Sequence, residues 1–300
     1  MIVFGILVGA LLLGYLALIL LILLRRVFPR SPQVSRRRIG RIEFPSDGRE
    51  TGQAVLEVRN IYKSFDQPVL KDVSFRLHRG ETLGIMGRSG SGKSVTLKII
   101  AGLMKPDQGQ VLFKERDITE LDEDELLAFR KRVSYVFQGG AVFDFLNVRE
   151  NIAYPLREMN LFDEAEIQSR VDYILDAVEL ENVAELHAAE LSIGSKKQTA
   201  IGRAIAIQPE IILYDEPTTN LDPMIAKSLS RLIRKLDQQE ELTSIVVTHD
   251  LKCIQVVADQ VILLKDGGIH FEGNLEGFRE SPDPFVQAFI AGRRFQPVAG

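Results

Sequence analysis

The chain has 300 residues, which is enough for one large domain with appendages or for two small domains. Its formal net charge of −4 argues against a protein that binds nucleic acid through an overall positive charge. Cys253 is the single cysteine, so an internal disulfide is excluded and a reducing compartment is favoured.

The beginning of the chain differs in composition from the rest. Residues 2–24 carry no charged side chain, and about 20 apolar residues at a rise of ~1.5 Å each span a ~30 Å hydrocarbon core. Arginines follow with no acid before Glu43: Arg25, Arg26, Arg30, Arg36, Arg37, Arg38 and Arg41. Because positive flanks stay in the cytoplasm, we expect residues 1–27 to form a single transmembrane anchor with Met1 outside. A cleaved signal peptide is the competing interpretation, but it would need its positive charge before a shorter apolar run.

The rest of the chain is predicted to consist of a basic linker and one α/β domain. Residues 28–53 are typical of a linker because they are rich in proline and arginine and lack apolar periodicity. Residues 54–294 are predicted to form the domain. Strands are predicted at 54–65, 73–77, 82–86, 133–137, 211–216 and 244–250, with a hairpin at 261–273 that turns at Asp266-Gly267. Helices are predicted at 95–103 and 122–132, within 147–188, and at 285–292.

This alternation of strands and helices predicts a largely parallel sheet, with ligands beyond the carboxyl ends of its strands. The sequence GRSGSGKS at 87–94 stands between a predicted strand and a predicted helix and has the form G-x-x-x-x-G-K-[ST]. Glycines at these positions let backbone N–H groups surround a phosphate, and the helix N-terminus adds positive partial charge. The eight residues predicted to bind a nucleotide are Gly87, Arg88, Ser89, Gly90, Ser91, Gly92, Lys93 and Ser94. A Gly-rich turn without a ligand is the bland alternative.

Two roles follow from the chemistry of this loop. Lys93 would reach the β- and γ-phosphates, and the Ser94 hydroxyl would be a ligand of Mg²⁺.

The predicted strand IILYDE at 211–216 ends in two acids, Asp215 and Glu216. Asp215 would hold Mg²⁺ and Glu216 would be the general base that polarises the attacking water. Buried strands also end in acids for no chemical reason, but two adjacent acids in a P-loop chain favour a catalytic pair.

Over about residues 55–270 the chain resembles the nucleotide-binding subunit of an ABC transporter. The resemblance rests on the order of the P-loop, Gln138, LS-x-G at 191–194, the two acids, NLDP at 220–223 and His249. It implies ATP and Mg²⁺ as cofactors and a head-to-tail dimer of ATPase subunits. It also implies that Gln138 senses Mg²⁺, that Asp222 lies at the dimer seam, and that His249 contacts the γ-phosphate in catalysis. A lone histidine after a strand is otherwise usually incidental.

The same resemblance points to Phe65 as the aromatic residue that stacks on adenine. Stacking needs only a π face, so phenylalanine can replace the more usual tyrosine. An aromatic residue at the edge of a half-buried strand is the structural alternative, and Tyr62 is the rival candidate for stacking.

The segment QGGAVFDFLNVRENIAYPLRE at 138–158 narrows the resemblance to the ATPases of Mce-linked lipid transporters. In such transporters this region receives the coupling helix of the permease. The resemblance therefore implies a membrane permease, a lipid-binding Mce-type protein and the movement of phospholipid or a related lipid. Importers of amino acids share part of the segment. The helical subdomain is expected at about 140–205.

The signature loop LSIGS at 191–195 departs from the family pattern. Ser192 and Gly194, which would bind the partner's ATP, are present, but Ile193 replaces a glycine. An isoleucine costs little if that glycine has a negative φ, but about 1–3 kcal/mol if the position is strained. The basic residues Lys196 and Lys197, together with Arg203, are expected to place positive charge near the phosphates of the partner's ATP.

The fold class predicted from the sequence is α/β, a P-loop NTPase of the ABC ATPase type with a helical subdomain and a preceding transmembrane helix. The predicted function is ATP hydrolysis that drives lipid transport, at the inner (cytoplasmic) membrane with the ATPase domain in the cytoplasm. The alternatives are another cargo, such as an amino acid or a lipoprotein, or a weakly hydrolytic regulatory subunit. The sequence leaves open the direction of transport and the choice between a homodimer and a heterodimer.

Overall fold

The computed structural model describes residues 54–159 and 162–292 of the chain. The predicted anchor at 1–27 and the predicted linker at 28–53 lie outside these described residues. Within the described ranges, the structure contains no helix that is both long enough and apolar enough to span a bilayer.

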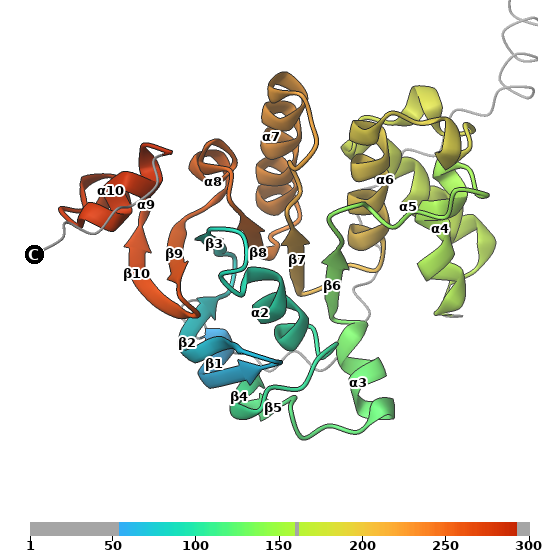
Figure 1. Cartoon of the computed structure of the whole chain (residues 1–300). Helices are drawn as coiled ribbons and strands as arrows, with labels where there is room; N and C mark the ends of the chain where they lie inside the picture. The colour runs from blue at the N-terminus through green and yellow to red at the C-terminus, as the bar shows by residue number, and fades with distance from the viewer. Residues whose placement is uncertain (1–53, 160–161, 293–300) are drawn as a thin grey trace, which may run out of the picture. The chain divides into compact units, whose positions relative to one another are not determined.

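A six-stranded sheet in the order β10-β9-β3-β8-β7-β6 forms the centre of the described part (Figure 1). Its strands are β3 (Thr82–Gly87), β6 (Val133–Val136), β7 (Ile211–Asp215), β8 (Thr243–Thr248), β9 (Gln260–Lys265) and β10 (Gly268–Asn274). Strand β3 is parallel to β8 and β9, and β7 is parallel to β6 and β8. Only β10 runs antiparallel, in the predicted hairpin with β9. The prediction of a largely parallel sheet is confirmed.

A separate antiparallel sheet in the order β2-β1-β4-β5 was not predicted. Its strands are β1 (Ala54–Ser64), β2 (Pro68–His78), β4 (Gln108–Phe113) and β5 (Arg116–Asp117). Strand β1 pairs with β2 through a short local turn, but it also pairs with β4, which lies about 50 residues later in the chain. Such non-local pairing is not visible in the alternation of a single strand.

The helices lie on both faces of the six-stranded sheet. Helices α2 (Lys93–Ile100) and α3 (Glu123–Arg130) share a core with the antiparallel sheet. The other face carries a second core with the remaining helices (Figure 1). These are α4 (Val148–Glu158), α5 (Glu164–Ala177), α6 (Ile193–Ala206), α7 (Pro223–Gln239), α8 (Leu251–Val257), α9 (Leu275–Glu280) and α10 (Pro284–Ile290).

Successive residues of the central strands explain why both faces are covered. Ile85 of β3 packs in the core with α2, whereas its neighbour Met86 packs in the core of the opposite face. Leu213 and Tyr214 of β7 divide in the same way. Because side chains alternate along a strand, a wholly apolar strand needs a cover on each face.

Several helix starts are fixed by capping. Asp122 caps α3 and Asn147 caps α4, each in a capping box with a glutamate three residues later. Helix α2 begins two residues earlier than predicted, because the phosphate loop leads directly into it. The helical pattern at 147–188 is correct for α4 and α5, but short 3₁₀ turns at Glu181–Val183 and Ala188–Glu190 follow them.

Candidate functional site

The ends of parallel strands bring the predicted polar residues to one edge of the six-stranded sheet. Strand β3 ends at Gly87, β7 ends at Asp215 and β8 ends at Thr248. These three strands are neighbours and run in the same direction. The phosphate loop, the acids and His249 therefore start from adjacent positions although they are far apart in the sequence.

The phosphate loop has the backbone of a cradle for an anion. Gly92, which precedes α2, has a φ of 97°, a conformation that disfavours any residue with a Cβ atom. A Cβ atom on Gly87 would lie 2.3 Å from the Ser91 Oγ and 3.0 Å from the carbonyl oxygen of Leu264, so a larger residue would displace its neighbours at the start of the loop. The Ser91 Oγ is buried and has no hydrogen-bond partner among the described residues. The loop thus fits a polyphosphate that approaches its backbone at the N-terminus of α2.

Lys93 is held inside this cradle. Its Nζ donates to the carbonyl oxygens of Gly87 at 3.0 Å and of Arg88 at 3.2 Å, and it lies 3.6 Å from Glu216 Oε1. The ammonium group is buried together with the carboxylate. An ammonium at this position is preorganised for a phosphate charge on the open side of the loop.

Ser94 and Asp215 form an oxygen donor set. The Ser94 Oγ donates to Asp215 Oδ1 at 2.9 Å. Hydroxyl and carboxylate oxygens suit Mg²⁺, which usually keeps few protein ligands and takes others from phosphates and water. Within the described ranges there is no group of three or more His, Cys, Asp or Glu side chains that could hold a metal alone. The pair therefore fits a magnesium ion that a nucleotide also binds.

Glu216 leaves strand β7 with a φ of 48°, so the strand ends one residue earlier than predicted. Its Oε2 accepts hydrogen bonds from the Thr219 hydroxyl at 3.0 Å and the Thr248 hydroxyl at 3.1 Å. His249 Nδ1 lies 2.9 Å from the same oxygen. A left-handed conformation at a non-glycine residue is found at functional sites, where the surroundings hold it in place.

The charge of Glu216 is set by opposing effects. Burial raises the pKa of its carboxyl, but the hydrogen bond and charge of His249 and the charge of Lys93 outweigh burial. The pKa of Glu216 is therefore below its ordinary value. A buried carboxylate that stays ionised at neutral pH has the state that a general base needs.

Three residues near the acids were missed in the sequence. The Tyr135 hydroxyl donates to Asp215 Oδ2 at 2.8 Å, and Thr219 and Thr248 contact Glu216. Thr248 directly precedes His249, so its place at the end of a buried strand was a usable signal. Tyr135 lies on β6, and no local pattern relates it to an acid that is 80 residues away.

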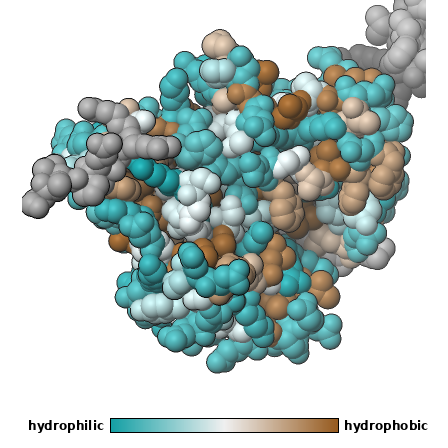
Figure 2. All heavy atoms as spheres, in the orientation of Figure 1, coloured by the Kyte–Doolittle hydropathy of each residue, from teal (hydrophilic) through white to brown (hydrophobic). Residues whose placement is uncertain are grey.

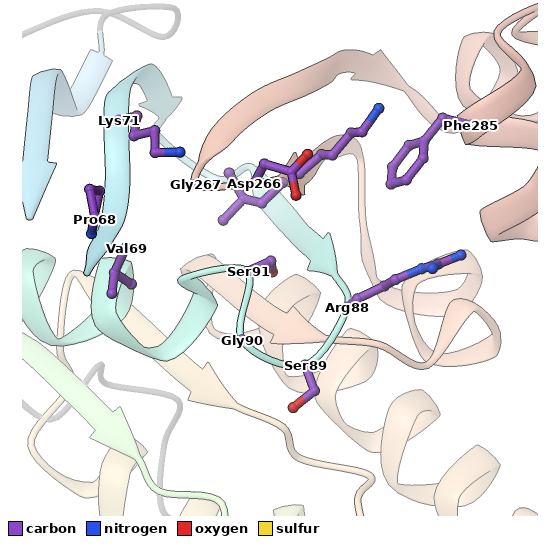
Figure 3. Close-up of a pocket in the computed structure, with 12 residues that line it drawn as sticks. Pro68, Val69, Lys71, Arg88, Ser89, Gly90, Ser91, Asp266, Gly267 and Phe285 are labelled. Atoms are coloured by element: carbon purple, nitrogen blue, oxygen red, sulfur yellow. The ribbon is translucent and has the colours of Figure 1, made fainter. Parts of the chain in front are cut away.

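A pocket of about 520 Å³ opens beside the phosphate loop (Figure 3). Arg88, Ser89, Gly90 and Ser91 form one wall, and the turn between β9 and β10 with the start of β2 forms another. Its size lies within the usual range for small-molecule sites. The Phe285 ring of α10 closes one end, with Arg88 Cζ 5.8 Å and Lys265 Nζ 4.3 Å from its centroid. The C-terminal helix α10 thus reaches the phosphate loop.

The remaining candidates for nucleotide contact lie around this centre. Phe65 is 58% exposed in the turn between β1 and β2, with Lys63 Nζ 5.6 Å from its ring centroid. The rival Tyr62 is less exposed. Gln138 is exposed in the turn that follows β6, at the same sheet edge as Asp215. The roles of Phe65 and Gln138 stay predictions.

The signature loop resolves the question of strain at Ile193. Ser192 caps helix α6, and its Oγ accepts from the Ser195 N–H at 3.1 Å. Ile193 is the first residue of that helix and has no positive φ. Its side chain is 56% exposed, whereas Gly194 is buried beside Ile225 of α7. The isoleucine therefore does not strain the backbone, and its bulk faces outward.

The expected cluster of positive charge after the signature loop is not formed by all three basic residues. Lys197 is buried, and its Nζ donates to the carbonyl oxygens of Glu216 at 3.3 Å and Pro217 at 2.7 Å. Burial lowers its pKa. The prediction for Lys197 is wrong, because its face of α6 is turned toward its own chain. Lys196 pairs with Asp144 at 3.0 Å, and Arg203 lies over Phe143.

Asp222 caps the start of a helix. It is the N-cap of α7, and its Oδ1 accepts from the Met224 N–H at 2.8 Å. Pro223 occupies the first helical position, as is common for proline. Asp222 is exposed, so this capping role leaves it accessible to a neighbouring subunit.

Comparisons with known proteins show the family of this chain. Residues 70–219 match the family model of the ABC transporter. The chain is similar to Protein TRIGALACTOSYLDIACYLGLYCEROL 3, chloroplastic, of Arabidopsis thaliana. The two are 38% identical over an alignment that covers 81% of this chain and 75% of that protein. It is also similar to the intermembrane phospholipid transport system ATP-binding protein MlaF of Haemophilus influenzae. The identity is 37%, and the alignment covers 82% of this chain and 94% of that protein. Relatives named for sulfate/thiosulfate import and methionine import are similar at 38% and 32% identity.

A solved structure has the same fold. The dimeric, post-hydrolysis structure of the ATP-binding cassette MJ0796 bound to ADP and Pi has a TM-score of 0.68 and 34% identity. The match covers 73% of this chain and 98% of that one. The predicted P-loop fold of the ABC ATPase type is thereby confirmed. The chain belongs to the ABC transporter family, and it is an ABC-type ATPase.

Proposed function

We propose that this chain is the ATP-hydrolysing subunit of an ABC complex that transports phospholipid or a related lipid with an Mce-type partner. The observation that carries the proposal is the surface formed by residues 138–158, together with the similarity of the chain to MlaF. The hydrolytic part rests on the geometry around Glu216.

The residues of the site divide the work of ATP hydrolysis. Lys93 and the backbone of the phosphate loop bind and orient the phosphates. Glu216 accepts a proton from the attacking water, which its lowered pKa permits at neutral pH. His249 orients the Glu216 carboxylate through its Nδ1 and leaves Nε2 for the γ-phosphate.

Ser94 and Asp215 would hold Mg²⁺, with Gln138 as a further ligand. The ion would neutralise charge on the β- and γ-phosphates. The 2.9 Å hydrogen bond between Ser94 and Asp215 shows that the two oxygen donors lie together. Phe65, with its exposed ring beside the start of β2, would stack on adenine.

We further propose a head-to-tail dimer in which each ATP is also bound by the partner's Ser192 and Gly194. Exposure of Ser192 and Ile193 at the start of α6 supports this, because it leaves the loop accessible. Asp222 and Met224, exposed at the start of α7, would lie at the same seam. The related cassette MJ0796 is dimeric in its solved structure.

A buried asparagine shapes the segment at 138–158. Asn151 is fully buried, and its Oδ1 accepts from the Phe143 N–H at 2.8 Å. Its Nδ2 donates to the carbonyl oxygens of Phe143 at 3.1 Å and Asn147 at 2.9 Å. These bonds fix the loop between β6 and α4, in which Phe145 is exposed.

The outward side chains form an aromatic surface. Phe145 is 75% exposed and Tyr154 of α4 is 41% exposed, and both rings pack against Phe143. Figure 2 shows apolar residues among polar ones over the region of α4 and α6. Exposed aromatic residues of this kind are typical of protein interfaces. We propose that this surface, on a helical subdomain at about 140–205, receives a permease.

The beginning of the chain completes the proposal. We propose residues 1–27 as a transmembrane anchor, 28–53 as a basic linker and 54–294 as the ATPase domain, which would lie in the cytoplasm at the inner membrane. The support is the uncharged run at 2–24 followed by arginines. If the chain stays in the membrane pellet after alkaline carbonate washing without its permease, the anchor is supported. Release into the supernatant would refute it.

The aromatic surface gives the test of the transport proposal. Phe145→Ser in the full chain should reduce recovery of the permease and the Mce-type protein in complexes purified from native membranes. Leu127→Ser is the matched control, because Leu127 is 55% exposed on α3, outside the proposed surface. Lipid in the purified wild-type complex, identified by mass spectrometry, would support the cargo. Recovery of an amino-acid or lipoprotein system instead would overturn it.

A weakly hydrolytic regulatory subunit is the second candidate, because Ile193 places bulk on the exposed signature loop. The intact set of Lys93, Asp215, Glu216 and His249 favours the hydrolytic subunit. ATP turnover of the purified wild-type complex separates the two candidates. Turnover no faster than that of the Glu216→Gln variant would favour the regulatory subunit.

A further inference from the structure

Tyr135 contacts the proposed metal-binding residue Asp215 from a different strand. It lies on β6, one of the two edge strands of the six-stranded sheet, and its hydroxyl donates to Asp215 Oδ2 at 2.8 Å. The other carboxylate oxygen, Oδ1, accepts from Ser94 at 2.9 Å. Both oxygens of the proposed metal-binding acid are therefore engaged by hydroxyl groups from two different elements.

The register of the sheet explains how the two side chains meet. Tyr135 is directly opposite Leu213 in the parallel pair of β6 and β7. Residues 213 and 215 point to the same face, so Asp215 is the diagonal neighbour of Tyr135. A diagonal separation is too long for most side chains but is within reach of an aromatic one. A tyrosine is thus well suited to span this distance.

The ring of Tyr135 is held in place, because it packs against Phe137 with a centroid distance of 4.4 Å. A ring held in this way, with its hydroxyl donating to Asp215 Oδ2, favours one rotamer of the carboxylate. That rotamer leaves Oδ1 directed to Ser94.

We propose that Tyr135 is a positioning residue that orients Asp215 for Mg²⁺ in the nucleotide-bound ATPase. The inference rests on the proposed role of Asp215 as a metal ligand. Partners that hydrogen-bond a metal-binding carboxylate orient it, and their loss usually costs about 10- to 100-fold in metal affinity or activity. Tyr135 also packs against Phe137, which directly precedes Gln138, so the same residue contacts both Asp215 and the start of the turn after β6.

The test measures how much Mg²⁺ improves ATP binding rather than how fast ATP is hydrolysed. The full chain carries Glu216→Gln to suppress turnover, and the Kd for radiolabelled ATP is measured with Mg²⁺ and with EDTA. The ratio of the two Kd values reports the contribution of the metal. With Tyr135→Phe, we expect this ratio to fall roughly tenfold while the Kd in EDTA stays unchanged.

Tyr214 provides a matched control on the neighbouring strand. Its hydroxyl is fully buried and has no hydrogen-bond partner within the described part of the chain, and its side chain packs on the opposite face of β7. Tyr214→Phe removes the same atom close to Asp215 and should leave both Kd values unchanged. In a double variant with Asp215→Asn, Tyr135→Phe should have no further effect on the ratio, because the metal-binding carboxylate that Tyr135 orients is already removed.

The outcomes separate this inference from the proposed function. If Asp215→Asn lowers the ratio but Tyr135→Phe does not, the positioning role is refuted and the role of Asp215 stands. If Tyr135→Phe weakens ATP binding equally in EDTA, or lowers the unfolding midpoint enough to account for the loss, Tyr135 is only structural. If Asp215→Asn leaves the ratio unchanged, the metal-binding role of Asp215 fails and the inference fails with it.

Discussion

His249 Nδ1 lies 2.9 Å from Glu216 Oε2, and the two side chains come from the ends of neighbouring parallel strands. The histidine is exposed whereas the carboxylate is largely buried. Thr248, the residue before His249, donates to the same carboxylate oxygen. One strand end thus supplies two contacts that orient the proposed general base, and this arrangement makes the chemistry of Glu216 testable.

Replacement of Glu216 by glutamine should abolish most turnover without abolishing ATP binding. The amide keeps the shape of the side chain but cannot accept the proton, and loss of a general base typically costs about 10²- to 10⁴-fold in rate. Turnover of the purified complex and the Kd for ATP are the measurements. Glu280→Gln, at an exposed position of α9, is the control that should retain wild-type turnover. A Glu216→Gln variant with wild-type kcat would exclude the proposed base.

Removal of His249 should shift the pH dependence of turnover. The hydrogen bond and charge of His249 lower the pKa of Glu216 below its ordinary value of 4.5, so Glu216 loses its charge only when pH falls below that value. In His249→Ala the pKa of Glu216 should rise, because burial then meets less opposition. The acid limb of the kcat profile should move to higher pH, in addition to a lower plateau. An unchanged acid limb would show that His249 does not control the charge of Glu216.

Local sequence patterns were sufficient for the elements that carry the site. The strand before Gly87, the strand before Asp215 and the hairpin at Asp266-Gly267 were all predicted, and these two turn residues have φ values of 53° and 88°. Positive φ values at both positions are required by a two-residue hairpin turn of type I′, for which an Asp-Gly pair is favoured. The signals are local, so a single sequence was enough.

The contacts that were missed depend on pairing between distant strands. The diagonal between Tyr135 and Asp215 follows from the order of β6 and β7, and nothing near either residue reports it. The same holds for β1 and β4, whose pairing brings Lys63 within 2.7 Å of Asp107. Non-local pairing costs loop entropy and leaves no periodic trace.

Two helices were also missed. Helix α7, although well capped by Asp222, was not among the predicted elements, and neither was the seven-residue helix α8.

Substitution of Ile193 should separate the effect of bulk from the effect of backbone. Because Ile193 starts helix α6 without a positive φ, glycine relieves no strain there. Ile193→Gly should therefore destabilise the subunit by about 0.5–1 kcal/mol or less, as glycine does in helices. If the isoleucine hinders a partner's ATP, Ile193→Ala and Ile193→Gly should raise turnover equally. A rise in Ile193→Gly alone would show that backbone freedom is the limiting factor.

Asp237, a buried residue of α7 outside the candidate site, should make the stability of the protein depend on pH. Burial raises the pKa of this α7 residue from 3.8 to about 7, although hydrogen bonds from Ser244 and Thr82 and the charge of Arg234 oppose the rise. The folded protein therefore binds a proton that the unfolded chain releases. Its contribution to the free energy of unfolding is fully present below pH 3.8 and is lost as pH rises through about 7.

Asp237→Asn should remove this dependence. Relative to the variant, the wild type should lose on the order of 4 kcal/mol of stability between acid and mildly alkaline pH. Thermal unfolding midpoints of both proteins across that range are the measurement. Asp124→Asn, at an exposed position of α3, should instead follow the wild-type profile. Parallel profiles for wild type and Asp237→Asn would mean that the Asp237 carboxyl has the same pKa in the folded protein as in the unfolded chain.

Lys197 links the helix after the signature loop to the residues after β7. Its buried ammonium group bonds the carbonyl oxygens of Glu216 and Pro217, at 3.3 Å and 2.7 Å. Lys197→Met keeps much of the side-chain volume but leaves two buried carbonyl groups without this donor, which should cost about 1–3 kcal/mol of stability.

The same substitution should lower kcat, since the backbone of Glu216 loses a support. Lys196→Met is the matched control one residue earlier, because it breaks only a partly exposed ion pair with Asp144. Such pairs contribute about 0–1 kcal/mol, so this variant should unfold and hydrolyse ATP almost as the wild type does. Equal effects of the two substitutions on stability and turnover would show that the buried link does not support the catalytic glutamate.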